Sequence, residues 1–234
     1  MYTMEDLKTN RDAQITVGSI LFFVLAFPIY FGYAAGTADG TLGGGVADYQ
    51  VNGEITYVEL DSGIEYVADG TPWTATFNTD AINNADELNI VGLRVSMSYG
   101  EDETANGVGC AAPGASNPDA DTVSGIASHL NFTNSADGQN NGGNGAHDVT
   151  VEWYNASMVG AVVEGLTADE IKEQIDSMGA GLGDHSVEIG VTAQSDSCTL
   201  VGGDNEDNGE EVSYTVELVV LEYTIAPFID TSDI

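Results

Sequence analysis

An uncharged segment near the start of the chain constrains the fold most strongly. Residues 15–35, ITVGSILFFVLAFPIYFGYAA, contain no Asp, Glu, Lys or Arg. As a helix, a segment of this length rises about 1.5 Å per residue and spans roughly 30 Å, which matches the hydrocarbon core of a bilayer. Because the segment has no polar face, it does not suit an amphipathic helix on a soluble core. We therefore predict a helix that crosses a membrane or packs among other apolar helices.

The few basic residues predict the orientation of this helix. The chain contains only 4 Lys and Arg residues, and two of them, Lys8 and Arg11, lie just before the apolar segment. Basic residues that flank a membrane helix stay on the cytoplasmic side. We therefore expect residues 1–14 to be cytoplasmic and everything after residue 35 to lie outside the cell membrane.

The residues at the start of the segment carry a family resemblance. Arg11-Asp12-Ala13-Gln14-Ile15-Thr16-Val17-Gly18 resembles the class III signal of archaeal type IV pilins and archaellins. This resemblance implies cleavage between Ala13 and Gln14. Residues 15–35 would then leave the bilayer and stack against identical helices as the spine of a filament.

Two other interpretations of the segment stay open. Gly32-Tyr33-Ala34 offers small residues for cleavage of a secretory signal, although the apolar stretch is long for one. A permanent signal anchor is the simplest interpretation, and it is the one that we favour.

The charge of the chain limits its partners. With 38 Asp and Glu residues the net charge is −34. Such a surface repels nucleic acid and anionic lipid headgroups, so we expect no nucleic-acid partner. Salt screens this self-repulsion. We therefore predict a salt-exposed cell surface, marine or halophilic, and the scarcity of Lys fits an archaeal envelope.

Beyond the helix, the sequence predicts a mainly β ectodomain. A Gly-rich spacer, residues 36–47, precedes an acidic domain, residues 48–226, and a short tail, residues 227–234. Alternating apolar and polar residues predict seven or more strands, and hence an antiparallel β-sandwich of the immunoglobulin-like or jelly-roll kind. We expect the last strand to be central, because its second half is apolar on both faces. The expected strands are 54–60, 64–68, 73–78, 91–99, 149–154, 187–193 and 212–225.

One helix and one long loop complete the expected domain. Thr167 and Glu170 form a capping box, and we expect Ile171, Ile175 and Met178 to share the buried face of the helix. Residues 100–146 are rich in Gly, Asn, Asp and Ser, which predicts a long loop that projects from one end of the sandwich.

Cysteine and histidine suggest no catalytic centre. Cys110 and Cys198 are the two cysteines, and outside the membrane we expect them to form a disulfide. The three histidines, at positions 129, 147 and 185, are far apart in sequence, and we expect them to be exposed turn residues.

Clustered oxygen ligands make calcium the metal that we expect. One patch comprises Asp204, Glu206, Asp207, Asn208 and Glu210, and a second comprises Asp119 and Asp121. Asn131-Phe132-Thr133 and Asn155-Ala156-Ser157 are candidate glycosylation sites on the predicted outer side.

Known catalytic fingerprints are missing from the sequence, since it has no nucleophile elbow, His-Glu-x-x-His motif or phosphate-binding loop. We expect a membrane-anchored surface protein that is not an enzyme and has a structural, assembly or adhesive role. Its expected partners are lipid or identical helices through residues 15–35, and other surface proteins or copies of itself. The alternatives are a pilin-like filament subunit and a calcium-assisted module that binds a ligand or carbohydrate.

Overall fold

The computed structural model divides the chain into two compact units, Met1–Gly45 and Val46–Ile234. It describes residues 47–100, 116–117, 120–140, 143–194, 196–198, 204–205 and 207–229, and only positions 11, 14, 15, 22 and 23, all helical, before them. Most of the apolar segment, Ala13 of the predicted cleavage site and the tail after residue 229 therefore lie outside the described residues. Among the described residues, no helix is both long and apolar enough for a membrane crossing.

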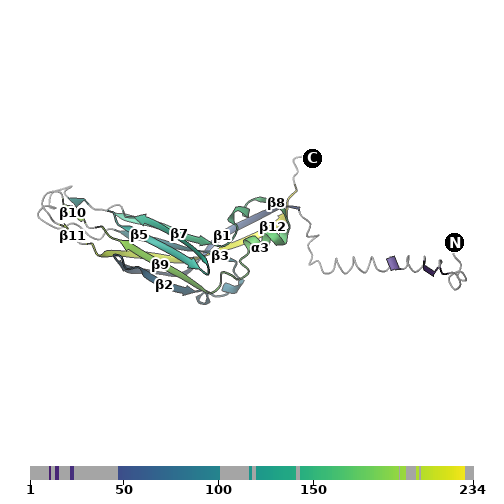
Figure 1. Ribbon diagram of the computed structural model, residues 1–234, viewed down its shortest axis with the longest axis horizontal. Helices are drawn as coiled ribbons and strands as arrows, with labels where there is room; N and C mark the ends of the chain where they lie inside the picture. The colour runs from purple at the N-terminus through teal and green to yellow at the C-terminus, as the bar shows by residue number, and fades with distance from the viewer. Residues whose placement is uncertain are drawn as a thin grey trace. The chain divides into compact units, whose positions relative to one another are not determined.

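In its described residues, the second unit is built mainly from antiparallel strands, as predicted, with one α-helix (Figure 1). The larger sheet has the strand order β7-β3-β12-β1-β8, and the smaller one β2-β9-β5-β6. Three short strands, β11-β10-β4, form a separate small sheet. The strands are β1 (Ala47–Ala68), β2 (Trp73–Asn78), β3 (Ile90–Gly100), β4 (Ser116–Asn117), β5 (Thr122–His129), β6 (Phe132–Gln139), β7 (Asn144–Glu152), β8 (Val162–Leu166), β9 (Asp184–Thr192), β10 (Asp196–Cys198), β11 (Asp204–Asn205) and β12 (Gly209–Pro227), and the helices are α3 (Ala168–Ile175), η1 (Thr79–Ala81), η2 (Ala85–Glu87) and η3 (Ala156–Met158).

The main core lies between the two larger sheets. Alternate residues of β3 and β12, such as Leu93 and Val216, meet Val187 and Ile189 of β9 there. This burial follows the period of two that the sequence displays in each strand. The central position predicted for the last strand is confirmed, because β12 pairs with β1 on one side and β3 on the other.

A second core explains why the end of β12 is apolar on both faces. Val219 and Leu221 point away from the main core and pack with Ile171 and Ile175 of α3. The capping box between Thr167 and Glu170 is confirmed. Met178, however, lies beyond the helix, which ends at Ile175, and its side chain is exposed. Among the described residues, both cores consist of residues from the second unit.

Two of the predicted boundaries are wrong. The expected strands 54–60 and 64–68 form one strand, β1, with a bulge between Glu59 and Asp61. The expected loop 100–146 contains the hairpin β5–β6. Two inward positions of β5, Gly125 and Ala127, carry small residues, and at Gly125 a Cβ atom would overlap Met97 of the opposite sheet.

Candidate metal centre

Three carboxylates meet at the end of the domain where β12 begins. Asp121 directly precedes β5, and Glu210 is the second residue of β12. Asp207 lies in the turn before β12, where its Oδ1 accepts a hydrogen bond from the Gly209 backbone N–H at 3.0 Å. Gly209 has φ +138° and approaches the Val67 carbonyl too closely for any side chain, so this turn requires glycine.

The three side chains are close enough to bind one ion. One ligand oxygen from each of Asp121, Asp207 and Glu210 lies within 4.8 Å of the others. Calcium–oxygen distances of about 2.4 Å allow two ligands on opposite sides of an ion to lie about 4.8 Å apart. The arrangement therefore has the size of a single calcium site.

Burial makes this cluster unusual. The side chains of Asp121 and Glu210 are both 0% exposed. Asn140, at the end of β6 and 2% exposed, donates from Nδ2 to Asp121 Oδ2 at 2.8 Å and to Glu210 Oε1 at 3.3 Å. The Gln194 backbone N–H donates to Asp121 Oδ1 at 2.6 Å. These contacts fix the positions of the carboxylates, but amides carry no net charge.

Both basic side chains in the described part of this domain form ion pairs elsewhere. After residue 11 the sequence contains only two basic residues, Arg94 and Lys172. The Arg94 guanidinium binds Glu217 at 2.6 Å, and the Lys172 ammonium lies 4.0 Å from Asp176. Because neighbouring buried carboxylates repel one another, the site favours a bound divalent cation. An all-oxygen ligand set suits a hard cation such as calcium rather than zinc.

The structure joins the two acidic patches that the sequence analysis kept apart. Asp207 and Glu210 come from the first patch and Asp121 from the second. Asn208 lies exposed beside them. Only the backbone of Asp204, in β11, is described, and Glu206 and Asp119 lie outside the described residues. Asn140 was missed, because the strand that positions it was predicted to be loop.

The prediction of exposed histidines is wrong for two of the three. His129 and His185 are buried and stack with ring centroids 4.2 Å apart. Burial lowers the pKa of His185 to about 4, and the charge of the neighbouring His129 adds to this lowering. His147 is half-buried in a different place, where its Nδ1 lies 3.1 Å from the Tyr99 hydroxyl.

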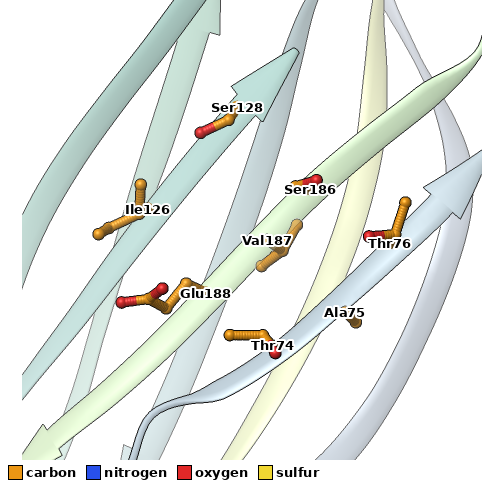
Figure 2. Close-up of a pocket in the computed structure, with 8 residues that line it drawn as sticks. All are labelled: Thr74, Ala75, Thr76, Ile126, Ser128, Ser186, Val187 and Glu188. Carbon is orange, nitrogen blue, oxygen red and sulfur yellow. The ribbon is translucent and has the colours of Figure 1, made fainter. Parts of the chain in front are cut away.

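A hollow on the outer face of the smaller sheet offers little chemistry (Figure 2). Its lining includes Thr74, Thr76, Ser128 and Ser186, and Glu188 is the only titratable side chain among the eight residues drawn. Acid–base catalysis needs a positioned proton donor and acceptor, and one carboxylate among hydroxyls does not supply such a pair.

The predicted disulfide and glycosylation sites are described in part. Cys110 lies outside the described residues, whereas the backbone of Cys198 pairs with that of Ser116, which follows Cys110 by six positions. Asn131 is exposed in the β5–β6 turn. Asn155 is half-buried, and its side chain donates to Gln174 Oε1 at 3.0 Å and accepts from the Ser157 hydroxyl at 2.6 Å.

Comparisons with known proteins add no family to this description, since no family model and no curated protein matches the chain.

Proposed function

We propose that the protein is a membrane-anchored cell-surface protein whose β-sandwich carries a structural calcium ion. Residues 15–35 act as the anchor in this proposal, and the acidic domain faces a salty exterior. We further propose that the sandwich is of the immunoglobulin-like or jelly-roll kind, and that Cys110 and Cys198 form a disulfide.

The observation that carries the proposal is the distance, within the domain, between the start of β1 and the acidic cluster at Glu210. The first residues of β1 pair with the end of β12, as Tyr49 does with Pro227. Ala68, at the other end of β1, pairs with Gly209, next to Glu210. At about 3.3 Å per residue, Tyr49 and Ala68 are separated by about 60 Å along the strand. Within the domain, the cluster therefore lies at the opposite end of β1 from the residues where the chain enters.

A calcium ion at this tip would have a structural role. Glu210 lies in β12 of the larger sheet and Asp207 in the turn before it, whereas Asp121 directly precedes β5 of the smaller sheet. An ion bound by all three would therefore tie the two sheets together. Because two of the three metal-binding carboxylates are buried, the site suits a permanently bound structural ion better than an ion that exchanges with solvent.

A filament subunit is the second candidate, and the pilin-like residues Arg11 to Gly18 favour it. In that function residues 15–35 pack against identical helices instead of lipid. The same sandwich would then cover the outside of the filament.

Fractionation of native cells tests the proposed location. We expect the protein in the membrane fraction after washing at high salt, and we expect protease added to intact cells to cleave between residues 36 and 47 and release the domain. Protein that stays protected in intact cells, or that is released by the wash, would contradict the anchored surface location.

A further inference from the structure

A buried pair of histidines lies beside the α3–β9 loop, residues 176–183, which connects the helix to the smaller sheet. His129 at the end of β5 is 2% exposed, and His185 in β9 is 0% exposed. Their rings stack with an interplanar angle of 17°. The centre of the Trp153 ring lies 4.7 Å from that of His129 and 6.0 Å from that of His185. Neither histidine belongs to the acidic cluster, so the pair is a separate feature of the domain.

Both histidines bind backbone carbonyls of the loop or of the residue that follows it. His129 Nε2 lies 2.6 Å from the Ala180 carbonyl oxygen, and its Nδ1 lies 3.0 Å from the Asp184 carbonyl oxygen. His185 Nε2 lies 3.1 Å from the Gly181 carbonyl oxygen. Because a carbonyl oxygen only accepts hydrogen bonds, each of these three ring nitrogens has to carry a proton.

These contacts determine how many protons the pair holds. A neutral imidazole has one N–H group, and an imidazolium has two. His129 therefore donates to both carbonyls only as the imidazolium, and the Trp153 ring beside it stabilises such a cation. His185 needs one proton and is neutral, and its buried Nδ1 has no hydrogen-bond partner among the described residues. With every contact made, the pair carries a single positive charge.

One more proton would place like charges next to each other. It would enter at His185 Nδ1 and make both stacked rings cationic at a centroid distance of 4.2 Å. Burial opposes this charge most strongly and the charge of His129 adds to the effect, so the pKa of His185 is lowered to about 4. The closed arrangement therefore excludes the second charge until the surroundings are acidic.

The charged side chains on the surrounding elements are carboxylates. Asp184, next to His185, raises the pKa of that histidine, but less than burial lowers it. The Asp184 carboxylate accepts a hydrogen bond from Asn78 Nδ2 at 2.6 Å. Asp80 of η1 and Glu152 at the end of β7 are exposed. Among the described residues neither stacked histidine forms an ion pair, so no carboxylate neutralises a second charge on the pair.

The α3–β9 loop covers one end of the main core. Gly181 packs so closely on Ile90 that a Cβ atom would overlap the Ile90 side chain and carbonyl oxygen. Ile90 is buried in the main core, and Trp153 Nε1 donates to its carbonyl oxygen at 2.9 Å. Movement of the loop away from the core would expose Ile90 and the Trp153 ring to solvent.

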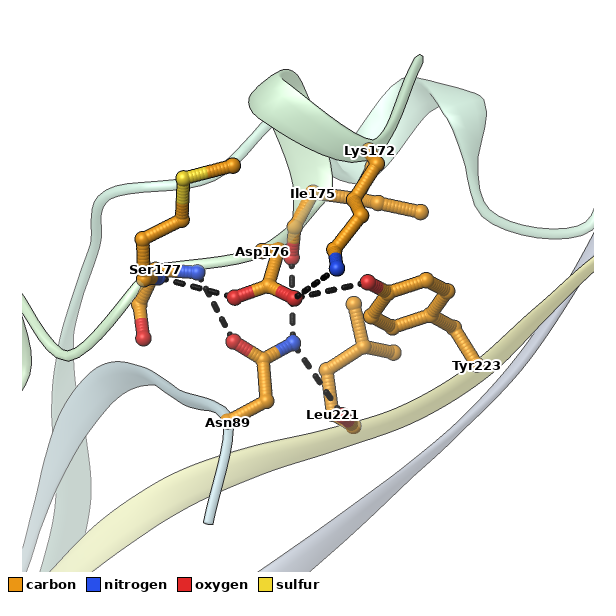
Figure 3. Close-up of polar contacts among 8 residues, drawn as sticks. Asn89, Lys172, Ile175, Asp176, Ser177, Leu221 and Tyr223 are labelled. Carbon is orange, nitrogen blue, oxygen red and sulfur yellow. Dashed lines mark hydrogen bonds and ion pairs between the residues drawn. The ribbon is translucent and has the colours of Figure 1, made fainter. Parts of the chain in front are cut away.

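Contacts without histidine fix both ends of this loop. At its beginning Asp176, the one charged residue of the loop, accepts a hydrogen bond from the Tyr223 hydroxyl at 2.7 Å (Figure 3). At its end the Gly183 backbone N–H donates to Thr79 Oγ1 at 2.9 Å. Among the described residues, only the two stacked histidines bind the middle of the loop, residues 179–182, through hydrogen bonds of their side chains.

We propose that His129 and His185 form a pH-sensitive latch, which holds the middle of the α3–β9 loop over the main core and releases it when a second positive charge enters the pair. The two sheets stay folded, because the loop contributes no strand and its ends remain bound. Opening exposes Ile90 and Trp153 in acidic surroundings. The latch requires neither the anchor nor the calcium ion, so this inference goes beyond the proposed function and does not rest on it.

The lowered pKa of His185 sets the sign and the size of the effect. A histidine whose pKa is lowered in the closed loop favours closure fully above its ordinary value of 6.5, and this preference is lost as the pH falls towards 4. From these two values, the ratio of open to closed loop should rise by about 70-fold between pH 7.5 and pH 4.5.

Hydrogen-exchange mass spectrometry of the full-length protein, in detergent, molar NaCl and constant calcium, measures this opening. Exchange rates at the two pH values are corrected for the intrinsic pH dependence of the reaction. The backbone N–H groups of Ala180 and Leu182, which donate to carbonyls within the loop, should lose about 70-fold in protection. The protection of the central strands β3 and β12 should fall by a factor at least about tenfold smaller.

Two variants assign the effect to the stacked pair. His185→Phe keeps a ring in the stack but cannot gain a proton, so the protection of its loop should change less than about fivefold. His147→Gln is the matched control and should respond as the wild type does, because His147 lies outside the stack, beside Tyr99. Chelation of calcium at neutral pH should leave the loop of the wild type protected.

Several outcomes would overturn the proposal. One is a wild-type loop whose protection does not change with pH. Another is an equal loss of protection in the loop and in β3 and β12, since the domain would then unfold as a whole, and this comparison needs no variant. An equal response of His185→Phe and the wild type, or a loop opened by the chelator alone, would show that carboxylates or the metal hold the loop instead. Loss of the membrane location would contradict the proposed function but leave these results unaffected.

Discussion

Calcium should stabilise the domain through Asp121, Asp207 and Glu210. Extracellular calcium sites have dissociation constants of about 10⁻⁴ to 10⁻³ M, so about 10 mM calcium exceeds the constant by roughly 10- to 100-fold. Binding to the folded state alone then contributes about 1.4 to 2.7 kcal/mol. For a domain of this size each kcal/mol raises the melting temperature by about 2 to 4 °C. We expect an increase of roughly 3 to 10 °C over a chelator-treated sample.

The variant Glu210→Gln separates a specific site from general screening. It removes one buried charge from the cluster, so the chelator-treated domain should melt at the same temperature as the wild type or higher. In this variant, the increase in melting temperature that calcium causes should fall by at least half. Glu54→Gln is the matched control, because Glu54 is exposed on β1 and carries the same charge.

Differential scanning calorimetry in molar NaCl, with magnesium as a second control, measures these shifts. Equal melting temperatures with chelator and with calcium would refute the reasoning. So would an equal loss of the calcium effect in Glu54→Gln and Glu210→Gln, because screening alone would then explain the stabilisation.

Three further predictions follow from individual contacts. The pKa of His185 is lowered to about 4 from an ordinary value of 6.5, so its contribution to stability is complete above pH 6.5 and is lost as the pH falls towards 4. This contribution is roughly 3 kcal/mol, and urea unfolding at several pH values should reveal it as a pH dependence that is weaker in His185→Phe. Asn89 donates to the Ile175 and Leu221 carbonyls and accepts from Ser177, so Asn89→Ala should lower the free energy of unfolding by about 2 to 4 kcal/mol. Asn134→Ala, which loses one exposed bond to the Thr150 carbonyl, should cost less than about 1 kcal/mol, and equal costs would contradict this account. Mass spectrometry of native glycopeptides should find glycan on exposed Asn131 and none on Asn155, whose side chain is bound to Gln174 and Ser157; the reverse pattern would be a contradiction.

Features that depend on neighbouring residues could be predicted from the sequence. The capping box needs only Thr167 and Glu170, and its two hydrogen bonds are present. The alternation in β3 and β12 reports directly which residues face the core, because side chains in a strand have a period of two. The sequence also shows that the strand is apolar on both faces from Val219 to Leu221. The second core, between β12 and α3, explains this pattern.

Features that depend on contacts distant in sequence could not be predicted. β5 was missed because its buried positions are Val123, Gly125, Ala127 and His129, which are small or polar and gain their burial from the opposite sheet. The same omission hid Asn140, and it kept Asp121 apart from Glu210. The sequence analysis divided β1 into strands 54–60 and 64–68, but pairing with β12 keeps the strand continuous through a bulge. His129 and His185 are preceded by polar residues, and their burial arises from their mutual stacking and from contacts with Trp153, which is distant in sequence.

The N-terminal residue of the mature protein, isolated from native membranes, tests the anchored surface location most directly. Intact mass and terminal peptide analysis can distinguish the three forms of the chain. The proposal predicts that the peptide containing Lys8 and Arg11 is retained. A mature chain that begins at Gln14 would contradict the anchor and support the filament subunit, and one that begins after Ala34 would support a secreted domain.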